Sequence, residues 1–199
     1  MSSHSNKNTS DENGSETLAK NTVSEITHIR PLLRIADFLD TLIRTIGSWF
    51  CWISVALIFF IILQVILRYA FKSGLIFLEE IQWHLYGVLI MMGLSYGQVT
   101  GAHVRVDLVH QYFSRKTKAW IEIIGFLLLL APFTFVLFDH SWDFMYEAWR
   151  LDEGSDAPEG LPMRWVIKSA IPLGMALLFV SGFSQFLRDI VKVTDHGSE

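Results

Sequence analysis

Cysteine and charge are both scarce in this sequence, and each shortage excludes a class of protein. Cys51 is the only cysteine in 199 residues, so the chain cannot form an internal disulfide or a metal site of several thiolates. Charged residues make up 18% of the chain, whereas soluble domains average about 25%. The sequence also lacks a nucleophile motif, a phosphate-binding loop and a metal-ligand cluster. We therefore expect no enzyme activity, no cofactor and no nucleic-acid partner.

Long apolar runs take the place of the missing charge. Crossing about 30 Å of hydrocarbon as a helix takes about 20 residues. Helices buried in a soluble bundle would show a polar face, which residues 53–63 lack. The sequence therefore predicts an all-α membrane protein with four transmembrane helices, surrounded by membrane lipids. The predicted spans cover about residues 46–70, 81–100, 119–140 and 165–187.

The distribution of basic residues predicts how these helices are oriented. Lysine and arginine near helix ends favour the cytoplasmic side of a membrane. Nine of them flank the side that holds both termini and the second loop, and five flank the other side. We therefore expect an N-in/C-in topology, with both termini in the cytoplasm. The third loop, on the outer side, is long and acidic; it is either a docking surface or a solvated connection.

The chain divides by composition into three parts. Residues 1–28 are rich in Ser, Asn, Thr and Glu, which predicts a disordered polar tail. Residues 29–190 hold the four-helix transmembrane domain, and residues 191–199 form a short cytoplasmic tail. Pro31 suits the first turn of an amphipathic helix that leads into the first span. That helix is either an interfacial anchor or a surface that docks against a partner's helix.

The second predicted helix carries three glycines at regular spacing. Gly93, Gly97 and Gly101 form two overlapping G-x-x-x-G units on one face. Glycines at this spacing let helix backbones approach closely in lipid, although glycine is also frequent in membrane helices generally. We therefore treat them as candidate contact residues. Pro132 and Pro172 are expected to kink the third and fourth helices.

Ionisable residues are missing from the middle of all four runs. Pumps and coupled carriers usually place one in mid-membrane, where it is unfavourable unless it has a function. Gln64 is the deepest polar side chain, and a hydrogen bond between helices accounts for it. We therefore expect a subunit of a transporter, and the missing carboxylate argues against a stand-alone exporter. The rival interpretation is a membrane anchor of a redox complex, in which His84 and His140 share a haem iron.

Short motifs carry a resemblance to a known family. The first helix ends in Gln-Val-Ile-Leu-Arg-Tyr-Ala-Phe at 64–71, and Leu-Glu-Glu-Ile follows at 78–81. The second helix contains Gly93 and closes with Gly-Ala-His-Val-Arg-Val-Asp-Leu at 101–108. In this order the motifs resemble the small membrane subunit of tripartite ATP-independent periplasmic (TRAP) transporters, the DctQ-like family. The resemblance is clearest over about residues 35–187.

The resemblance implies a function, a location and a set of partners. In this family a periplasmic substrate-binding protein captures an organic acid. A large polytopic membrane subunit then carries the acid inward by an elevator motion, driven by an ion gradient that is commonly of sodium. The small subunit is a scaffold for the large one in the bacterial inner membrane. The resemblance therefore implies an accessory subunit that has the large TRAP subunit and the binding protein as partners.

The motif residues are the candidate contact residues. Arg68 faces the same membrane surface as Glu79 and Glu80, so a charge pair there can join the first two helices. An exposed pair contributes at most about 1 kcal/mol, so contact with a partner and simple interfacial exposure remain alternative roles. Residues 103–107 lie where the second helix leaves the membrane, and they can cap helices or touch the large subunit. The candidate set is Arg68, Tyr69, Glu79, Glu80, Gly93, Gly97, Gly101, His103 and Asp107.

Overall fold

The structure, a computed structural model, describes residues 5–72, 74–101 and 114–195 of the chain. Within these ranges the regular elements are all helical, which confirms the predicted all-α fold. They are α1 (Ser5–Ala70), α2 (Ile76–Thr100), α4 (Arg115–Gly125), the π-helical turn η1 (Phe126–Leu130), α5 (Ala131–Arg150) and α6 (Trp165–Asp195). Because α4, η1 and α5 follow one another without a break, they form one continuous rod.

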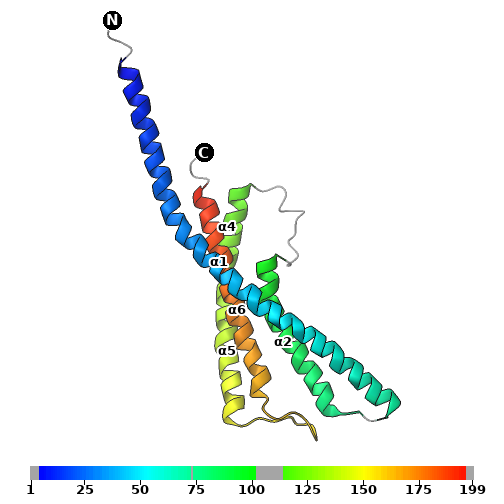
Figure 1. The fold of residues 1–199 in the computed structure, drawn as a ribbon. Coiled ribbons are helices and arrows are strands. Elements are labelled where there is room, and N and C mark those ends of the chain that lie inside the picture. The colour runs from blue at the N-terminus through cyan, green and yellow to red at the C-terminus, as the bar shows by residue number, and fades with distance from the viewer. Residues whose placement is uncertain (1–4, 73, 102–113, 196–199) are drawn as a thin grey trace.

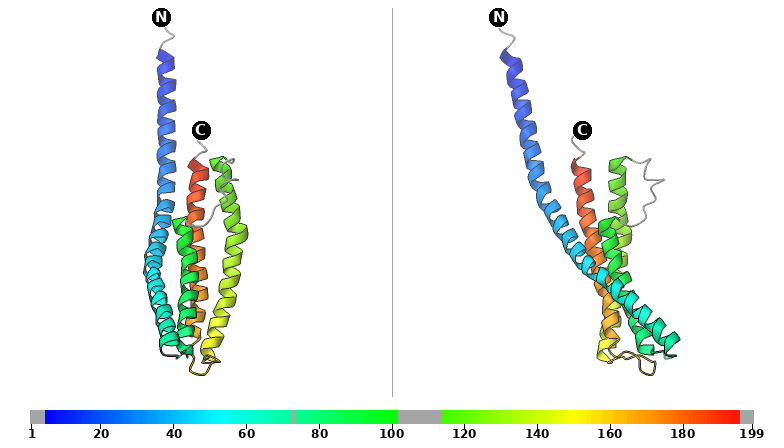
Figure 2. Two further views of the ribbon diagram at one scale, coloured as in Figure 1. Left: turned by 90° about the vertical axis from the view of Figure 1, so that its right-hand side faces the viewer. Right: turned by 45° about the vertical axis from the view of Figure 1, so that its right-hand side comes forward.

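Successive rods run in opposite directions (Figure 1). The end of α6 lies at the same end of the bundle as the early part of α1, and we call this the terminal end (Figure 2). Residues 71–72 and 74–75 and the connection at 151–164 lie at the opposite end, which we call the loop end (Figure 2). The first part of α1 projects beyond the bundle, and α1 crosses α5 and α6 at a steep tilt (Figures 1 and 2).

Helix α6 is the centre of the packing, because it contacts α1, α2, α4 and α5. Its contact faces use very small side chains. A Cβ atom at Gly174 would lie 2.9 Å from the Cβ of Met91 on α2, and one at Gly182 would lie 2.8 Å from Leu130. Ser181 is 2% exposed on the same helix. Small residues let backbones approach closely, which is how helices associate where apolar burial gives no advantage over lipid.

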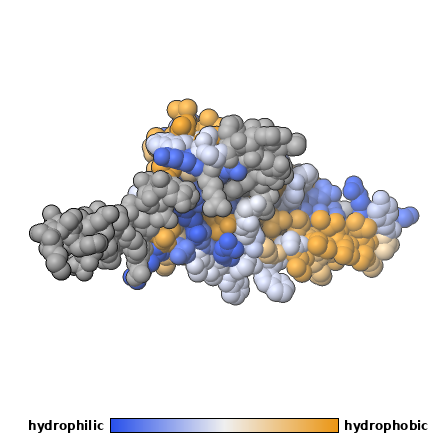
Figure 3. Space-filling model, turned by 90° about the horizontal axis from the view of Figure 1, so that it is seen from above, coloured by the Kyte–Doolittle hydropathy of each residue, from blue (hydrophilic) through white to orange (hydrophobic). Residues whose placement is uncertain are grey.

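The outside of the bundle is apolar. On the α4–α5 rod, Leu128 is 72% exposed and Phe135 is 69% exposed, whereas Thr134 is 1% exposed. Seen from above, apolar residues form patches on the outer surface of the part of the chain that the structure describes (Figure 3). This arrangement suits lipid as the surrounding medium, because polar groups are satisfied inside the protein and apolar side chains face outward.

The prediction of four membrane spans is corrected to three candidate spans in the described chain. Three segments of the described chain are long and apolar enough: Pro31–Ala70, Lys116–Arg150 and Trp165–Thr194. Helix α2 does not qualify, because charged and amide side chains occupy both ends of its 25 residues and shorten its apolar centre. These side chains are Glu79, Glu80, Gln82 and Gln98.

Helix α1 begins earlier than the sequence predicts. The sequence predicts a helix that starts near Pro31, whereas in the structure α1 begins at Ser5 and Pro31 lies inside it. An internal proline removes one backbone hydrogen bond, yet the turns on both sides continue. The structure therefore gives helix over residues 5–28, where composition predicts a disordered tail. The end of α1 at Ala70, the end of α2 at Thr100 and the start of α6 at Trp165 coincide with the predicted span boundaries.

The two predicted kink sites differ in their local structure. Helix α5 has Pro132 in its first turn, directly after the π-helical turn η1. Proline lacks an N–H and crowds the carbonyl four residues earlier, so a wider turn before it relieves the crowding. The amide of Ala131 bonds to the carbonyl of Phe126, five residues back. Pro172 lies inside α6, which remains a single helix from Trp165 to Asp195.

The close approach of α6 to α2 at Gly174 can be tested by mutation. We expect Gly174→Leu to lower the melting temperature of the purified protein in detergent, because the new side chain collides with Met91 and separates α6 from α2. Overpacking of this kind costs about 1–3 kcal/mol. Gly93→Leu is the matched control, since a Cβ there meets nothing within 4 Å. Equal melting temperatures for both variants would contradict the central role of the α2–α6 contact.

Candidate functional site at the loop end

Helices α1 and α2 are joined near the loop end by three polar contacts. The Gln82 Nε2 donates to the Phe60 carbonyl at 3.3 Å, and the Gln64 Nε2 donates to the Glu79 Oε1 at 3.0 Å. Arg68 Nη1 lies 3.8 Å from the same Glu79 oxygen. Gln64 is only 6% exposed, and the hydrogen bond to Glu79 satisfies its Nε2, whereas its buried Oε1 has no hydrogen-bond partner among the described residues. Glu79 therefore interacts with two side chains of α1, the buried amide of Gln64 and the exposed guanidinium of Arg68.

Glu80 points to a different part of the molecule, the connection between α5 and α6. Its Oε1 accepts a hydrogen bond from the Ser155 hydroxyl, and its Oε2 accepts one from the Leu161 amide at 2.5 Å. These two hydrogen bonds, with smaller contributions from the charges of Arg164 and His84, hold the Glu80 pKa below its ordinary value. The carboxylate of Glu80 thus fastens a loop that lies 75 and 81 residues away in the sequence.

Gly160 allows the loop to approach Glu80 closely. A Cβ atom at this position would collide with the Ser155 side chain and lie 3.0 Å from the Glu80 Oε2. The Gly160 amide donates to the Ala157 carbonyl at 3.1 Å, which closes a tight turn between the two residues bound by Glu80. A larger residue at 160 would therefore displace either the turn or the carboxylate.

Glu153 fastens the same loop to α6. The Lys168 Nζ donates to the Glu153 Oε2 at 2.5 Å, and the Arg164 amide donates to the Glu153 carbonyl at 2.9 Å. Lys168 also lies 3.8 Å from the centre of the Phe144 ring on α5. This cation–π contact adds to the charge pair. The loop is therefore tied to α2, α5 and α6 together, and we call residues 151–164 with Glu80 and Lys168 the loop clamp.

The two glutamates predicted as alternative partners of Arg68 make different contacts in the structure. Arg68 pairs with Glu79, as one of the two predicted alternatives has it, whereas Glu80 contacts the α5–α6 connection. Both members of the Arg68–Glu79 pair are about half exposed or more, at 65% and 47%. Such a pair contributes little in water. Tyr69 is 80% exposed, so it projects away from the contacts described here.

The glycines of α2 differ from the predicted arrangement. A side chain at Gly93 would meet nothing within 4 Å, so no helix of the described chain packs closely there. Gly101 has φ of 69°, and its amide bonds to the carbonyls of Gln98 and Gly97, so it ends α2 in a left-handed conformation. A close contact that requires glycine does involve α2, but the glycine belongs to α1: a Cβ at Gly47 would collide with Tyr96 of α2. His103 and Asp107 lie outside the described residues.

A second polar cluster joins α1 to α6 near the terminal end. The Arg188 Nη2 donates to Asp37 at 2.8 Å and to Asp40 at 2.6 Å. The fully buried Ser184 hydroxyl donates to the Ala36 carbonyl at 3.0 Å and to Asp40 at 2.5 Å. Asp37 and Asp40 of the predicted amphipathic helix therefore reach α6. The fully buried side chains of this segment are Ala36 and Ile43, whereas Ile35, Phe38 and Leu42 are exposed.

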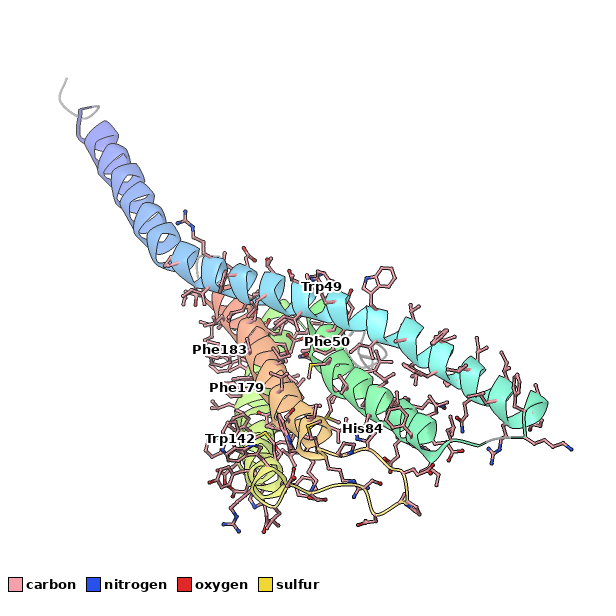
Figure 4. All side chains as sticks on the ribbon, turned by 60° about the horizontal axis from the view of Figure 1, so that its bottom comes forward. Trp49, Phe50, His84, Trp142, Phe179 and Phe183 are labelled. Carbon is pink, nitrogen blue, oxygen red and sulfur yellow. The ribbon has the colours of Figure 1, made fainter. Side chains whose placement is uncertain are left out.

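The histidines of the haem interpretation each bond to their own helix. His84 Nδ1 lies 2.5 Å from the Glu80 carbonyl, and His140 Nδ1 lies 2.9 Å from the Val136 carbonyl. Figure 4 shows where His84 lies on α2. Within the described ranges, no group of three His, Cys, Asp or Glu residues is placed to hold a metal ion.

Sequence reasoning missed the partners of Glu80 and the Asp37–Asp40–Arg188 cluster. Ser155 and Leu161 belong to no recognisable motif. The one signal in the sequence was that Arg68 can pair with only one of the two adjacent glutamates, so the other must have a different partner. The predicted amphipathic helix implied a polar face on this segment, but its pattern did not show that Asp37 and Asp40 pair with Arg188.

Long apolar helices, an apolar outside and polar contacts gathered near the helix ends define an integral membrane protein. The family described as "Tripartite ATP-independent periplasmic transporters, DctQ component" matches residues 57–192 of this chain. The match covers well over half of the 199 residues, so the chain belongs to the DctQ component family of TRAP transporters. It is a multi-pass inner-membrane component of a transport system, and its family is not one of enzymes. No curated protein and no solved structure matched the chain.

The lowered pKa of Glu80 predicts a dependence of stability on pH. A carboxyl whose pKa is lower in the folded state stabilises the fold above its ordinary pKa, and this contribution is lost as pH falls through the lowered value. We expect Glu80→Gln to melt at a lower temperature than the wild type at neutral pH, and the gap to shrink in acid. Thermal unfolding followed by tryptophan fluorescence over a pH series measures it.

Glu147→Gln is the control for this prediction, because its exposed side chain lies near the loop end outside the loop clamp. It should melt like the wild type across the series. A gap between Glu80→Gln and the wild type that stays constant or widens in acid would show that the carboxylate does not fasten the loop.

Proposed function

We propose that this chain is the scaffold subunit of its transporter. In this proposal it braces the static part of a large polytopic membrane subunit. That subunit imports an organic acid, delivered by a periplasmic binding protein, with an ion gradient as the driving force. The chain itself moves neither the acid nor the ion.

The observation that carries the proposal is the placement of polar contacts in the described chain. The network of Gln64, Arg68, Glu79 and Glu80 lies towards the loop end, and the cluster around Arg188 lies towards the terminal end. Both networks join helices of this chain to each other. Between them the helices present large apolar side chains to the outside, such as Ile58 at 57% exposure and Leu128 at 72%. This distribution fits a rigid brace in lipid, since a coupled carrier needs ionisable groups along its pathway.

The predicted N-in/C-in orientation is part of the proposal. In the structure α2 leads the chain from the loop end back towards the terminal end (Figure 2), although it is not apolar enough to count among the three candidate spans. The start of α1 and the end of α6 therefore lie towards the same end, which supports termini on one side of the membrane (Figure 2). The excess of basic residues on that side favours the cytoplasm. The loop clamp would then face the periplasm, where a binding protein delivers its ligand.

The proposal is tested by co-expression with a large TRAP membrane subunit from the same organism. An affinity tag on this chain should recover the large subunit from detergent-solubilised membranes. An unrelated polytopic protein expressed to the same level is the control and should stay in the flow-through. If the large subunit is not recovered although both proteins are present in the membrane, the scaffold function is wrong.

A further inference from the structure

A groove lies along the contact between α1 and α2, towards the loop end. Its volume is about 360 Å³, which is within the range of small-ligand sites. From α1 it is lined by Leu57 and Ile61, which are one helical turn apart. The residues of α2 that line it recur every three or four positions and so share one face of that helix. They are Glu79, Gln82, Trp83 and Tyr86.

The groove is polar at one end and apolar at the other. Glu79 is in the first turn of α2, and Arg68, which contacts it, is in the last turn of α1. Leu57 lies three helical turns before Arg68, about 16 Å along the helix axis. One leaflet of the hydrocarbon core is about 15 Å deep. The groove therefore passes from the level of the lipid headgroups towards the middle of the membrane, with polar and apolar groups in the same order as in a phospholipid.

The polar end of the groove has unused hydrogen-bonding groups. Arg68 Nη1 lies 3.8 Å from Glu79 Oε1, which is too far for a hydrogen bond. Within the described part of the chain, neither the Arg68 guanidinium nor the Glu79 Oε2 has a hydrogen-bond partner. The Trp83 and Tyr86 rings meet edge to face, and their indole N–H and hydroxyl also have no partner in that part of the chain. All four side chains are partly exposed, so one ligand can contact them together.

We propose that this groove binds phosphatidylethanolamine, with the ammonium group of the lipid against Glu79 and its phosphate against Arg68. The Arg68–Glu79 pair is neutral as a whole, so a zwitterionic headgroup satisfies both members. An anionic headgroup would instead bring like charge to the carboxylate. A primary ammonium donates three hydrogen bonds, whereas the quaternary ammonium of phosphatidylcholine donates none. The chemistry of the pair therefore selects phosphatidylethanolamine among the common phospholipids.

The apolar part of the groove fits one acyl chain of this lipid. The chain lies against Leu57 and Ile61, and the Trp83 and Tyr86 donors serve the phosphate and ester oxygens at the membrane interface. A transmembrane helix is about 10 Å across, so a length of about 16 Å would need roughly 1200 Å³. That is about three times the volume of the groove. The inference requires only that the chain lies in a bilayer, so it stands apart from the scaffold function.

Ile61→Trp tests whether the groove is the site, because the indole would fill it. Ile62→Trp is the matched control, since Ile62 is exposed on the same helix but does not line the groove. The full-length chain is purified in detergent with equal amounts of phosphatidylethanolamine, phosphatidylcholine and phosphatidylglycerol that carry the same acyl chains. Native mass spectrometry then counts the lipids retained. We expect the wild type and Ile62→Trp to prefer phosphatidylethanolamine, and Ile61→Trp to lose this preference.

Glu79→Gln tests the chemistry of the headgroup contact. The new amide oxygen can still accept the hydrogen bond from Gln64, but the negative charge is gone. We expect the preference for phosphatidylethanolamine over phosphatidylcholine to fall about fivefold, the size expected for a partly exposed charge pair. Glu147→Gln is the control, because it removes an exposed carboxylate that does not line the groove, and it should keep the full preference.

Photo-crosslinking in membranes identifies the occupant directly. Tyr86 replaced by p-benzoylphenylalanine should form an adduct with phosphatidylethanolamine on irradiation. The same replacement at Ile58, which is 57% exposed outside the groove, reports the average lipid of the membrane. We expect the adducts at position 86 to be enriched in phosphatidylethanolamine over those at position 58. An adduct with a protein at position 86 would assign the groove to a partner and overturn the proposal.

Other results would also contradict a lipid site in this groove. Equal retention of the three lipids by the wild type would show only bulk lipid. Equal preference in Ile61→Trp and Ile62→Trp would place the lipid elsewhere. A lower melting temperature for Ile61→Trp than for Ile62→Trp would show that this chain itself fills the groove. An unchanged preference in Glu79→Gln would remove the headgroup contact on which the choice of lipid depends.

Discussion

The packing of α6 against its neighbours is the contact on which the rest of the structure depends. In lipid, burial of apolar side chains gives no advantage, so helices associate through close backbone approach and hydrogen bonds. Helix α6 supplies both, with Gly174 and Gly182 at its close approaches and Ser184 bonded to α1. Because α1, α2, α4 and α5 all contact α6, its position sets the spacing of every other helix.

The two polar networks set the orientation of α1 and the position of the α5–α6 connection, which packing against α6 alone does not determine. Near the terminal end, Arg188 holds α1 by two aspartates, which determines the face that α1 turns outward. At the loop end, Glu80 and Glu153 hold the α5–α6 connection against α2 and α6. Helices α1 and α6 are thereby held by polar contacts near both ends of the bundle, which suits it to resist bending. A rigid unit with an apolar outside is what a scaffold for a moving membrane subunit requires.

Local sequence patterns predicted local features well. The apolar runs gave the helical fold, and the ends of α1 and α2 at Ala70 and Thr100 followed from where those runs stop. The Arg68–Glu79 pair was also predictable, since a short connection brings the two residues together. The partners of Glu80 were not, because they lie far away in sequence and only the tertiary fold brings them near. Glycine spacing identified a face of α2 at Gly93, but spacing does not show which helix, if any, lies against that face.

Transport by the reconstituted complex tests the central claim most directly. Proteoliposomes would contain the large subunit with or without this chain, the binding protein outside, and an imposed ion gradient. The substrate is the labelled organic acid that the binding protein is first found to retain. If this chain is a scaffold, uptake requires both membrane subunits, and this chain alone gives only the background of empty liposomes. Uptake by this chain alone, or full uptake by the large subunit without it, would contradict the account.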